Sequence, residues 1–382
     1  MCPFNSEHKA PDAAVFERTD GSIGFKCFHN SCSGQTWKDV RALFEPPRSW
    51  RTNAPPSGQA PHRQQPEPPR ILSCAEVLKV ETPAEEVIFD GYPVPARGLT
   101  LLVGTPKSGK TLLAVQEGLA IARKRSLFDY YKILKSGPVM IIEQDDPGGA
   151  ASIKTILERS GVNSDTPLFV VPQLPFGLGL NLLDWLKEQI TKLSLVFVVI
   201  DSYTAVRGPR AQGIDIVKQE QTELRQIDAL GKELGSAIKL IHHASKGAAL
   251  LDWTQTAAGS FAVTGASETQ VHLSRFRDLD GGAAERLVRI QGRHSGDAYL
   301  VLRFRKDTLD FEWVLEGGAA EFYPVLKQIK AELSGTFGPK ELSQATGVSR
   351  ATAHRIIARL RFAGVLDKVG FGQYRLSAGL KL

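Results

Sequence analysis

The chain has little cysteine and no long apolar run, and both features restrict its class. Only four cysteines occur in 382 residues, which is too few for a disulfide framework. No apolar segment approaches the ~20 residues that a membrane-spanning helix needs, and residues 1–30 lack the continuous apolar core of a secretory signal. We therefore expect a cytoplasmic protein in a reducing compartment, with no membrane partner.

The excess of charge of one sign is also small. The net charge is +6 at pH 7, and the isoelectric point is near 9.0. This mild excess is compatible with nucleic-acid binding but does not establish it. The hydrophobic fraction of 42% is enough for a sizeable core, and the length predicts two or three domains.

Residues 99–111 are the most informative stretch of the chain. They begin with a short apolar run, residues 99–103, which predicts a buried parallel strand. The next eight residues fit the pattern G-x-x-x-x-G-K-[ST], and residues 112–123 are helical in character. The residues predicted to bind ATP are Gly104, Thr105, Pro106, Lys107, Ser108, Gly109, Lys110 and Thr111.

The chemistry of phosphate binding explains these residue types. Gly104 and Gly109 allow a tight turn whose N–H groups converge on phosphate oxygens. Lys110 can reach the β- and γ-phosphates, and the Thr111 hydroxyl can bind Mg²⁺. The positive end of the following helix would lie beneath the phosphates. ATP and Mg²⁺ are therefore the predicted cofactors.

Strand and helix signals alternate after the loop. Strands are expected at residues 138–142, 168–171, 195–200 and 237–241, and helices at 149–160, 180–193 and 214–234. This alternation predicts an α/β domain over residues 71–316, with a mostly parallel sheet covered by helices on both faces. Functional residues should lie at the carboxyl ends of the strands, where Gly104, Asp145, Asp201 and His243 are found.

Acidic residues that follow two of the expected strands are candidates for roles in hydrolysis. Asp201 ends the apolar run 195–200 and is interpreted as the Walker B carboxylate, which holds Mg²⁺ directly or through water. Glu143-Gln144-Asp145-Asp146-Pro147 follows another strand, and a carboxylate there can polarise the attacking water. The residues alone leave Glu143 and Asp145 as competing candidates.

Residues 1–45 are predicted to form a small metal-binding module. Cys2, His8, Cys27 and Cys32 form a set suited to tetrahedral Zn²⁺, with His29 as a competing ligand. Two short strands around a turn at residues 20–21 would bring the ligand pairs together. Eight prolines then fall within residues 46–70, which predicts a flexible, extended linker.

Residues 320–382 are predicted to form a DNA-binding module. Helices are expected at 321–333, 338–347 and 349–362, followed by a hairpin at 364–376, and this order resembles winged-helix domains. The third helix is basic and is expected to enter the major groove of duplex DNA. Its candidate contacts are Arg350, Thr352, Arg355 and Arg359.

The segment His242-His243-Ala244-Ser245-Lys246-Gly247 resembles the H-H-A-S-K-G segment of plasmid RepA-like hexameric helicases, which have RecA-like P-loop cores. Together with the other motifs, the resemblance covers roughly residues 75–315. It implies a replicative helicase of a mobile element, and a homo-oligomer, with a hexamer expected. His243 takes the position of the γ-phosphate sensor. Alignment on Pro147 puts the catalytic Glu of the E-D-P motif at Asp145.

This chain departs from the plasmid helicases at two positions. Their Arg-Gly-Ser segment is Ala258-Gly259-Ser260 here, and the later arginine finger falls near Glu268. Gln291-Gly292-Arg293-His294-Ser295-Gly296 instead resembles the K-x-R-x-G finger segment of other replicative helicases. Arg293 is therefore the candidate finger. Lys246, in a loop that faces the channel of ring ATPases, is the candidate contact to single-stranded DNA.

The N-terminal segment resembles the zinc ribbons that precede primase and helicase domains in plasmid and phage replication proteins. The favoured interpretation is an ATP-driven motor on DNA. An ATP-switched DNA-binding regulator and a recombination or partition ATPase are the alternatives. The sequence leaves open the unwinding polarity, the ring size, the DNA sequence read and whether the N-terminus is complete.

Overall fold

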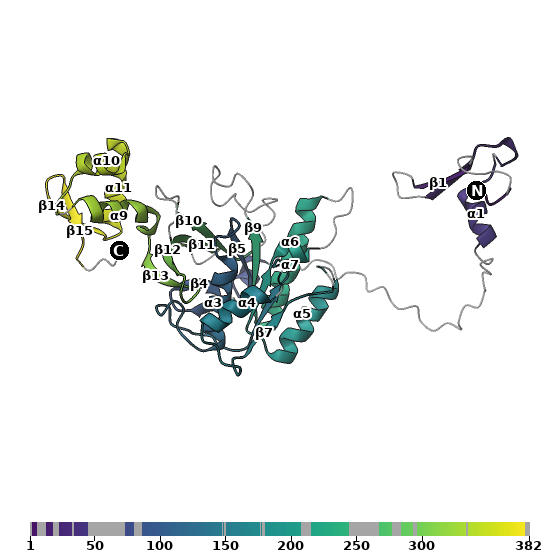
Figure 1. The fold of residues 1–382 in the computed structure, drawn as a ribbon, viewed down its shortest axis with the longest axis horizontal. Coiled ribbons are helices and arrows are strands. Elements are labelled where there is room, and N and C mark those ends of the chain that lie inside the picture. Colours follow the sequence, from purple (N-terminus) through teal and green to yellow (C-terminus); the bar gives the residue numbers. More distant parts are fainter. Residues whose placement is uncertain are drawn as a thin grey trace. The chain divides into compact units, whose positions relative to one another are not determined.

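The computed structural model describes residues 2–5, 13–17, 23–32, 34–44, 73–79, 86–146, 148, 150–175, 177, 180–207, 215–243, 267–276, 284–292, 296–333 and 335–378. The chain divides into two compact units, residues 1–81 and 82–382, and each is described by itself. Figure 1 shows their elements. Within the described residues, no helix combines the length and the apolar character that crossing a membrane requires.

The first unit contains a short antiparallel hairpin and small helices. Strands β1 (Ala13–Glu17) and β2 (Ile23–Cys27) pair, as the sequence predicted, and α1 (Trp37–Phe44) follows a single 3-10 turn, η1 (Asn30–Cys32). The core of this unit is small and contains Cys2, Phe25, Cys27, Cys32 and Val40. A further short helix, α2 (Cys74–Val77), begins with a capping box at Ser73 and Glu76.

The second unit is built on a nine-stranded sheet with the order β13-β12-β11-β10-β5-β9-β8-β6-β7. Six neighbouring strands are parallel and three are antiparallel. The parallel strands are β5 (Gly98–Gly104), β6 (Val139–Glu143), β7 (Leu168–Val171), β8 (Phe197–Asp201), β9 (Ala237–His243) and β10 (Thr269–Arg275). The mostly parallel α/β sheet that the alternation predicted is therefore confirmed.

Helices cover both faces of this sheet (Figure 1). The helices are α3 (Lys110–Ala122), α4 (Ala151–Arg159), α5 (Leu180–Leu193), α6 (Tyr203–Val206) and α7 (Ile216–Leu234). Helices α3 and α4 pack in one hydrophobic core and α5 and α7 in the other, on opposite faces of β5. Leu102 belongs to the first core, whereas Leu101 and Val103 belong to the second, as strand alternation requires.

A buried ionic cluster fixes the helix that follows the P-loop. Glu117 of α3 accepts a hydrogen bond from the Tyr92 hydroxyl at 2.8 Å and pairs with the Lys239 ammonium of β9. Tyr92 lies in β4 (Tyr92–Pro95), which pairs with β3 (Val87–Phe89), a hairpin that the sequence analysis did not predict. Because a buried charge is costly without a partner, this cluster holds α3 in one register against β9.

The antiparallel strands extend the sheet beyond β10. They are β11 (Glu285–Gly292), β12 (Gly296–Arg305) and β13 (Asp310–Glu316). Strands β10 and β13 were not predicted from the sequence. Strand β13 packs against α3 through Gln116, whose side-chain amide exchanges two hydrogen bonds, at 2.7 and 2.8 Å, with the Phe311 backbone.

The C-terminal residues form three helices and a hairpin. After the 3-10 turn η4 (Ala320–Phe322), the elements are α9 (Tyr323–Glu332), α10 (Pro339–Thr346), α11 (Arg350–Phe362), β14 (Leu366–Gly370) and β15 (Gln373–Leu376). Their core continues into the sheet, because Leu326 and Ile356 share a hydrophobic cluster with Leu287 and Val301. The C-terminal helices therefore cover one face of the antiparallel extension.

Candidate active site

The P-loop joins β5 to α3, and its two glycines are sterically required. A Cβ at Gly104 would lie 2.5 Å from Leu273 O, and one at Gly109 would lie 2.8 Å from Phe311 Cζ. Gly109 also has φ = 103°, which side-chain-bearing residues rarely adopt. Among the described residues, the buried Ser108 Oγ has no hydrogen-bond partner. A glycine-lined turn with an unsatisfied hydroxyl fits a phosphate group.

Lys110 lies in the first turn of α3, with its ammonium turned back over the loop. Its Nζ donates to Thr105 O at 3.1 Å and lies 3.3 Å from His243 Nδ1. Burial lowers the pKa of Lys110, and the carboxylates of Asp201 and Asp145 offset part of this shift. The cation therefore faces the position where the P-loop pattern puts the terminal phosphates of a nucleotide.

Thr111 and Asp201 form the pair of hard oxygen donors that Mg²⁺ prefers. The Thr111 hydroxyl donates to Asp201 Oδ2 at 2.5 Å, across 90 residues of sequence. Asp201 is the last residue of β8 and is 2% exposed. Burial raises the pKa of its carboxyl, and the bond from Thr111 and the Lys110 charge oppose the rise. The donor set thus fits Mg²⁺ beside a nucleotide phosphate.

Glu143 lies beside Asp201 because β6 and β8 are neighbours, and the two residues are register partners. Its side chain is buried, and its Oε1 accepts from the N–H groups of Asp145 and Asp146 at 2.8 and 2.9 Å. Burial raises the pKa of Glu143 to about 7, and Asp201 adds to the rise. The end of β6 therefore points a buried carboxyl at the Asp201 side of the site.

Asp145 makes a different contact. Its Oδ2 accepts from His243 Nε2 at 2.9 Å, and His243 Nδ1 faces Lys110. The Asp145 side chain is 44% exposed, and that of His243 is 31% exposed. The chain Asp145–His243–Lys110 therefore connects the ends of β6 and β9 to the first turn of α3.

Six predicted site residues thus come together at one edge of the sheet: Lys110, Thr111, Glu143, Asp145, Asp201 and His243. The spatial order explains this, because β5 lies beside β9, β9 beside β8 and β8 beside β6. His8, Arg293, Lys246 and Pro147, which the sequence analysis also named, lie outside the described residues.

Residues that were not predicted from the sequence also contact the P-loop. Arg275 Nη2 donates to Lys107 O at 2.5 Å, and Arg286 Nε donates to Ser108 O at 3.0 Å. Phe311 contacts the loop as well, since it limits the space at Gly109. These residues lie more than 160 positions after the loop and match no motif, so the fold alone identifies them.

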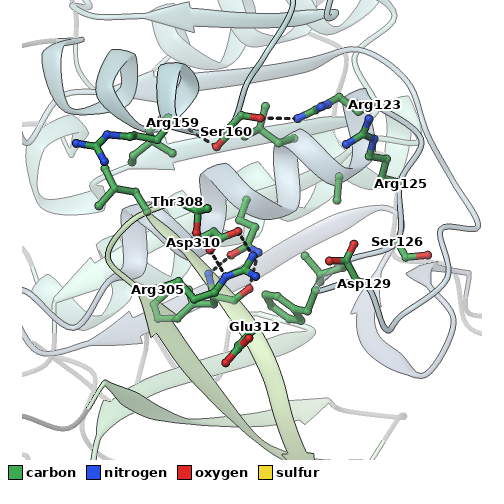
Figure 2. Close-up of a pocket in the computed structure, with 18 residues that line it drawn as sticks. Arg123, Arg125, Ser126, Asp129, Arg159, Ser160, Arg305, Thr308, Asp310 and Glu312 are labelled. Atoms are coloured by element: carbon green, nitrogen blue, oxygen red, sulfur yellow. Dashed lines mark hydrogen bonds and ion pairs between the residues drawn. The ribbon is translucent and has the colours of Figure 1, made fainter.

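A separate cavity of about 240 Å³ lies at the other end of α3. Figure 2 shows arginines around it, with Arg305 paired to Asp310 and Arg123 donating to Ser160 O. None of the predicted site residues lines this cavity. It is distinct from the phosphate site because α3 begins at Lys110 and ends at Ala122.

The first unit gathers three of the predicted zinc ligands. The sulfurs of Cys2, Cys27 and Cys32 all lie within 4.8 Å of one another, and the three side chains are buried. His29 Nδ1 lies 3.7 Å from Cys27 Sγ. Thiolate sulfur and imidazole nitrogen are ligands that Zn²⁺ prefers, so the donor set fits the predicted metal.

The predicted DNA contacts lie on α11 of the C-terminal module. Arg350, Arg355 and Arg359 are exposed, and Arg355 donates to the hydroxyl of the half-buried Thr352 at 3.3 Å. Ser349 caps the helix by accepting a hydrogen bond from Thr352 N. The opposite face of α11 is buried and includes Ala353, Ile356, Ile357 and Leu360.

Residues 63–249 match the model of a protein family described as an AAA domain. This segment contains the P-loop, Asp201 and His243, and ends before β10. Among solved structures, the chain is similar to one described as an ATPase domain, with 12% sequence identity and a TM-score of 0.47, over 58% of this chain and 86% of that chain. No curated protein matches the chain. The family match and the P-loop geometry support an ATP hydrolase of the P-loop class.

Proposed function

We propose that the protein is an ATP-driven, RecA-like motor that acts on DNA, as a replicative helicase of a plasmid, phage or other mobile element. The observation that carries the proposal is the convergence of Lys110, Thr111, Asp201 and His243 at the ends of three neighbouring strands. A cation, a magnesium-type oxygen pair and a histidine then surround one phosphate position, as ATP hydrolysis coupled to motion requires.

Glu143 is the proposed water-activating base. A base must lie within reach of the attacking water and on the side of the terminal phosphate. Glu143 ends β6 next to Asp201, and its Oε1 is fixed by two backbone N–H groups. A carboxylate held in this way can take a proton from water without moving. Mg²⁺, when bound at Thr111 and Asp201, supplies neutralisation of phosphate charge.

Asp145 is the proposed partner of His243 rather than the base. Its carboxylate accepts from His243 Nε2, which fixes the ring and presents Nδ1 to Lys110. A terminal phosphate bound at Lys110 would compete for the same contact. His243 would then report the presence of that phosphate to the end of β9, which continues into the predicted DNA-contacting loop at Lys246.

The C-terminal module supports the assignment to DNA. Three helices and a two-stranded hairpin follow one another, and Phe337 forms an additional antiparallel bridge with Tyr374. This is the order of a winged helix, in which α11 takes the place of the recognition helix. Its exposed arginines would contact the phosphates and bases of duplex DNA, and Lys246 is the proposed contact to single-stranded DNA in the channel of a ring.

The proposal also includes assembly of several copies into a ring and binding of one Zn²⁺ by the N-terminal module. The exposed side of a P-loop site leaves the γ-phosphate open to a neighbour, so Arg293 of a second copy is the proposed finger in a ring, with a hexamer expected. The N-terminal module would hold one Zn²⁺ through Cys2, Cys27 and Cys32, with His8 or His29 as the fourth ligand.

The test is ATP turnover with and without single-stranded DNA, together with strand displacement on a forked duplex. A motor should show DNA-stimulated ATP turnover and strand displacement. Both activities should be lost in D201N, because they depend on the Asp201 carboxylate. Turnover without displacement would favour the regulator or the recombination ATPase. Sizing in ATP and DNA, followed by negative-stain imaging, tests whether the active species is a ring.

A further inference from the structure

Two arginines brace the P-loop by donating hydrogen bonds to its main-chain carbonyl groups. They lie on neighbouring antiparallel strands, Arg275 at the end of β10 and Arg286 near the start of β11, and are register partners. Their guanidinium groups donate to the carbonyl oxygens of two consecutive loop residues, Lys107 at 2.5 Å and Ser108 at 3.0 Å. Bonds from a charged donor are stronger than those between neutral groups.

The two contacts fix different parts of the loop. Lys107 has φ = 62°. The next N–H group, that of Ser108, donates to Thr105 O at 3.2 Å and so closes a turn. This N–H group lies in the same peptide plane as Lys107 O. Arg275 therefore holds a strained turn closed. Ser108 O and Gly109 N–H also share one trans peptide plane and point in opposite directions. By holding Ser108 O, Arg286 sets the direction of Gly109 N–H.

The burial of Arg286 indicates that this contact is built into the fold. Arg286 is 7% exposed, although a guanidinium is costly to bury. Two of its nitrogens donate to main-chain oxygens, Nε to Ser108 O and Nη1 to Glu285 O at 2.9 Å. The Glu285 side chain lies on the other face of β11, where it accepts hydrogen bonds from Arg303 of β12 and from the Tyr323 hydroxyl of α9. The brace thus joins the P-loop to the antiparallel extension.

We propose that Arg275 and Arg286 are positioning residues for nucleotide binding, which act by fixing the carbonyls of Lys107 and Ser108 so that the loop N–H groups are oriented before phosphate arrives. This inference rests on the proposed nucleotide site. It assigns a role to the antiparallel extension, which lies outside the matched family segment. A loop that is already ordered loses less conformational entropy when the nucleotide binds, so its affinity for the nucleotide is higher.

The experiment measures the affinity of the full chain for a fluorescent ADP with Mg²⁺, and separately the KM and kcat of ATP hydrolysis. R286A should weaken ADP binding and raise KM, each about tenfold. The reason is that losing a hydrogen bond from a charged donor lowers the binding free energy by an amount that corresponds to about a tenfold change in affinity. R275A, at an exposed position, should have a smaller effect in the same direction. In both variants kcat at saturating ATP should change less than KM, because the lost contact orders the loop for ground and transition states alike.

Two further variants separate positioning from general stability. R286K keeps a charged donor and should recover part of the lost affinity. R289A is the matched control, because Arg289 lies on the same strand and pairs with Glu321 at 3.3 Å; it should bind ADP with the affinity of the unmodified chain. A purely structural role for Arg286 would instead lower kcat through a smaller folded fraction and leave KM unchanged.

The outcomes of the two proposals differ. Unchanged ADP affinity and KM in both R286A and R275A would overturn the brace and leave the ATPase proposal standing. Binding of ADP by the unmodified chain without turnover would refute hydrolysis, while the variants would still test the brace. Absence of any nucleotide binding by the unmodified chain would overturn both.

Discussion

Replacing Gly109 by alanine is the sharpest test of the P-loop geometry. The new Cβ would lie 2.8 Å from Phe311 Cζ, closer than real Cβ atoms approach, on a residue with φ = 103°. Phe311 is 1% exposed, and its backbone is tied to Gln116 of α3 by two hydrogen bonds. Neither the loop nor the ring can move without disturbing its neighbours.

The expected loss of folding stability in G109A is the sum of two free-energy costs. A left-handed backbone costs a residue with a side chain about 1–2 kcal/mol relative to glycine. Overpacking a close-packed position costs about 1–3 kcal/mol more. Gly161 provides the matched control, since its φ is 59° and nothing lies within 4 Å of its Cβ position. G161A should therefore show only the backbone cost.

Urea unfolding and ADP titration of both variants provide the comparison. We expect G109A to lose about 2–5 kcal/mol of stability and most of its ADP affinity, because relief of the clash distorts the loop. G161A should lose about 1–2 kcal/mol and bind ADP normally. Equal stabilities and equal ADP affinities for G109A and G161A would refute the steric argument.

Three other predictions follow from the site, the first unit and the sheet. E143Q should abolish turnover while ADP still binds, whereas D145N should keep more activity; equal losses would reject the assignment of the base. The full chain should bind about one Zn²⁺, measured by elemental analysis, and C27S should lose it, whereas C74S, at an exposed position, should not; retention by C27S would exclude the site. Burial and Arg289 lower the pKa of His272 to about 4 from 6.5, so the unfolded chain binds the proton at higher pH. The free energy of unfolding should therefore be unaffected by His272 above pH 6.5 and should fall by roughly 3 kcal/mol as pH drops towards 4. In urea titrations, H272N should flatten this pH dependence, and an unaltered slope would contradict the prediction.

The sequence predicted the parts of the site that short patterns define. The P-loop is one local motif, and Asp201 and His243 follow apolar runs that are recognisable as buried strands. The convergence of these residues also follows, because the carboxyl ends of parallel strands meet at one sheet edge. The predicted hairpin in residues 1–45 and the helices of residues 320–382 are confirmed as elements, whereas their zinc and DNA ligands stay predictions.

The sequence could not predict what depends on distant pairing. Strand β10 contains Gln270, His272 and Ser274 and has no apolar run, so its place beside β5 comes only from tertiary pairing. Arg275 and Arg286 meet the P-loop through that placement. The choice between Glu143 and Asp145 was also open, since both lie near one strand end. In the structure, Glu143 is buried beside Asp201, whereas Asp145 is exposed and paired with His243, and this difference is what supports the proposal of Glu143 as the base.

The most direct test of the central claim is the rate of ATP hydrolysis by the purified full chain with Mg²⁺, compared with K110A. Lys110 supplies the cation at the phosphate position, so the account predicts turnover in the unmodified chain, stimulated by single-stranded DNA, and none above background in K110A. Equal turnover in the two proteins, or none in the unmodified chain with DNA present, would contradict the assignment of an ATP-driven motor.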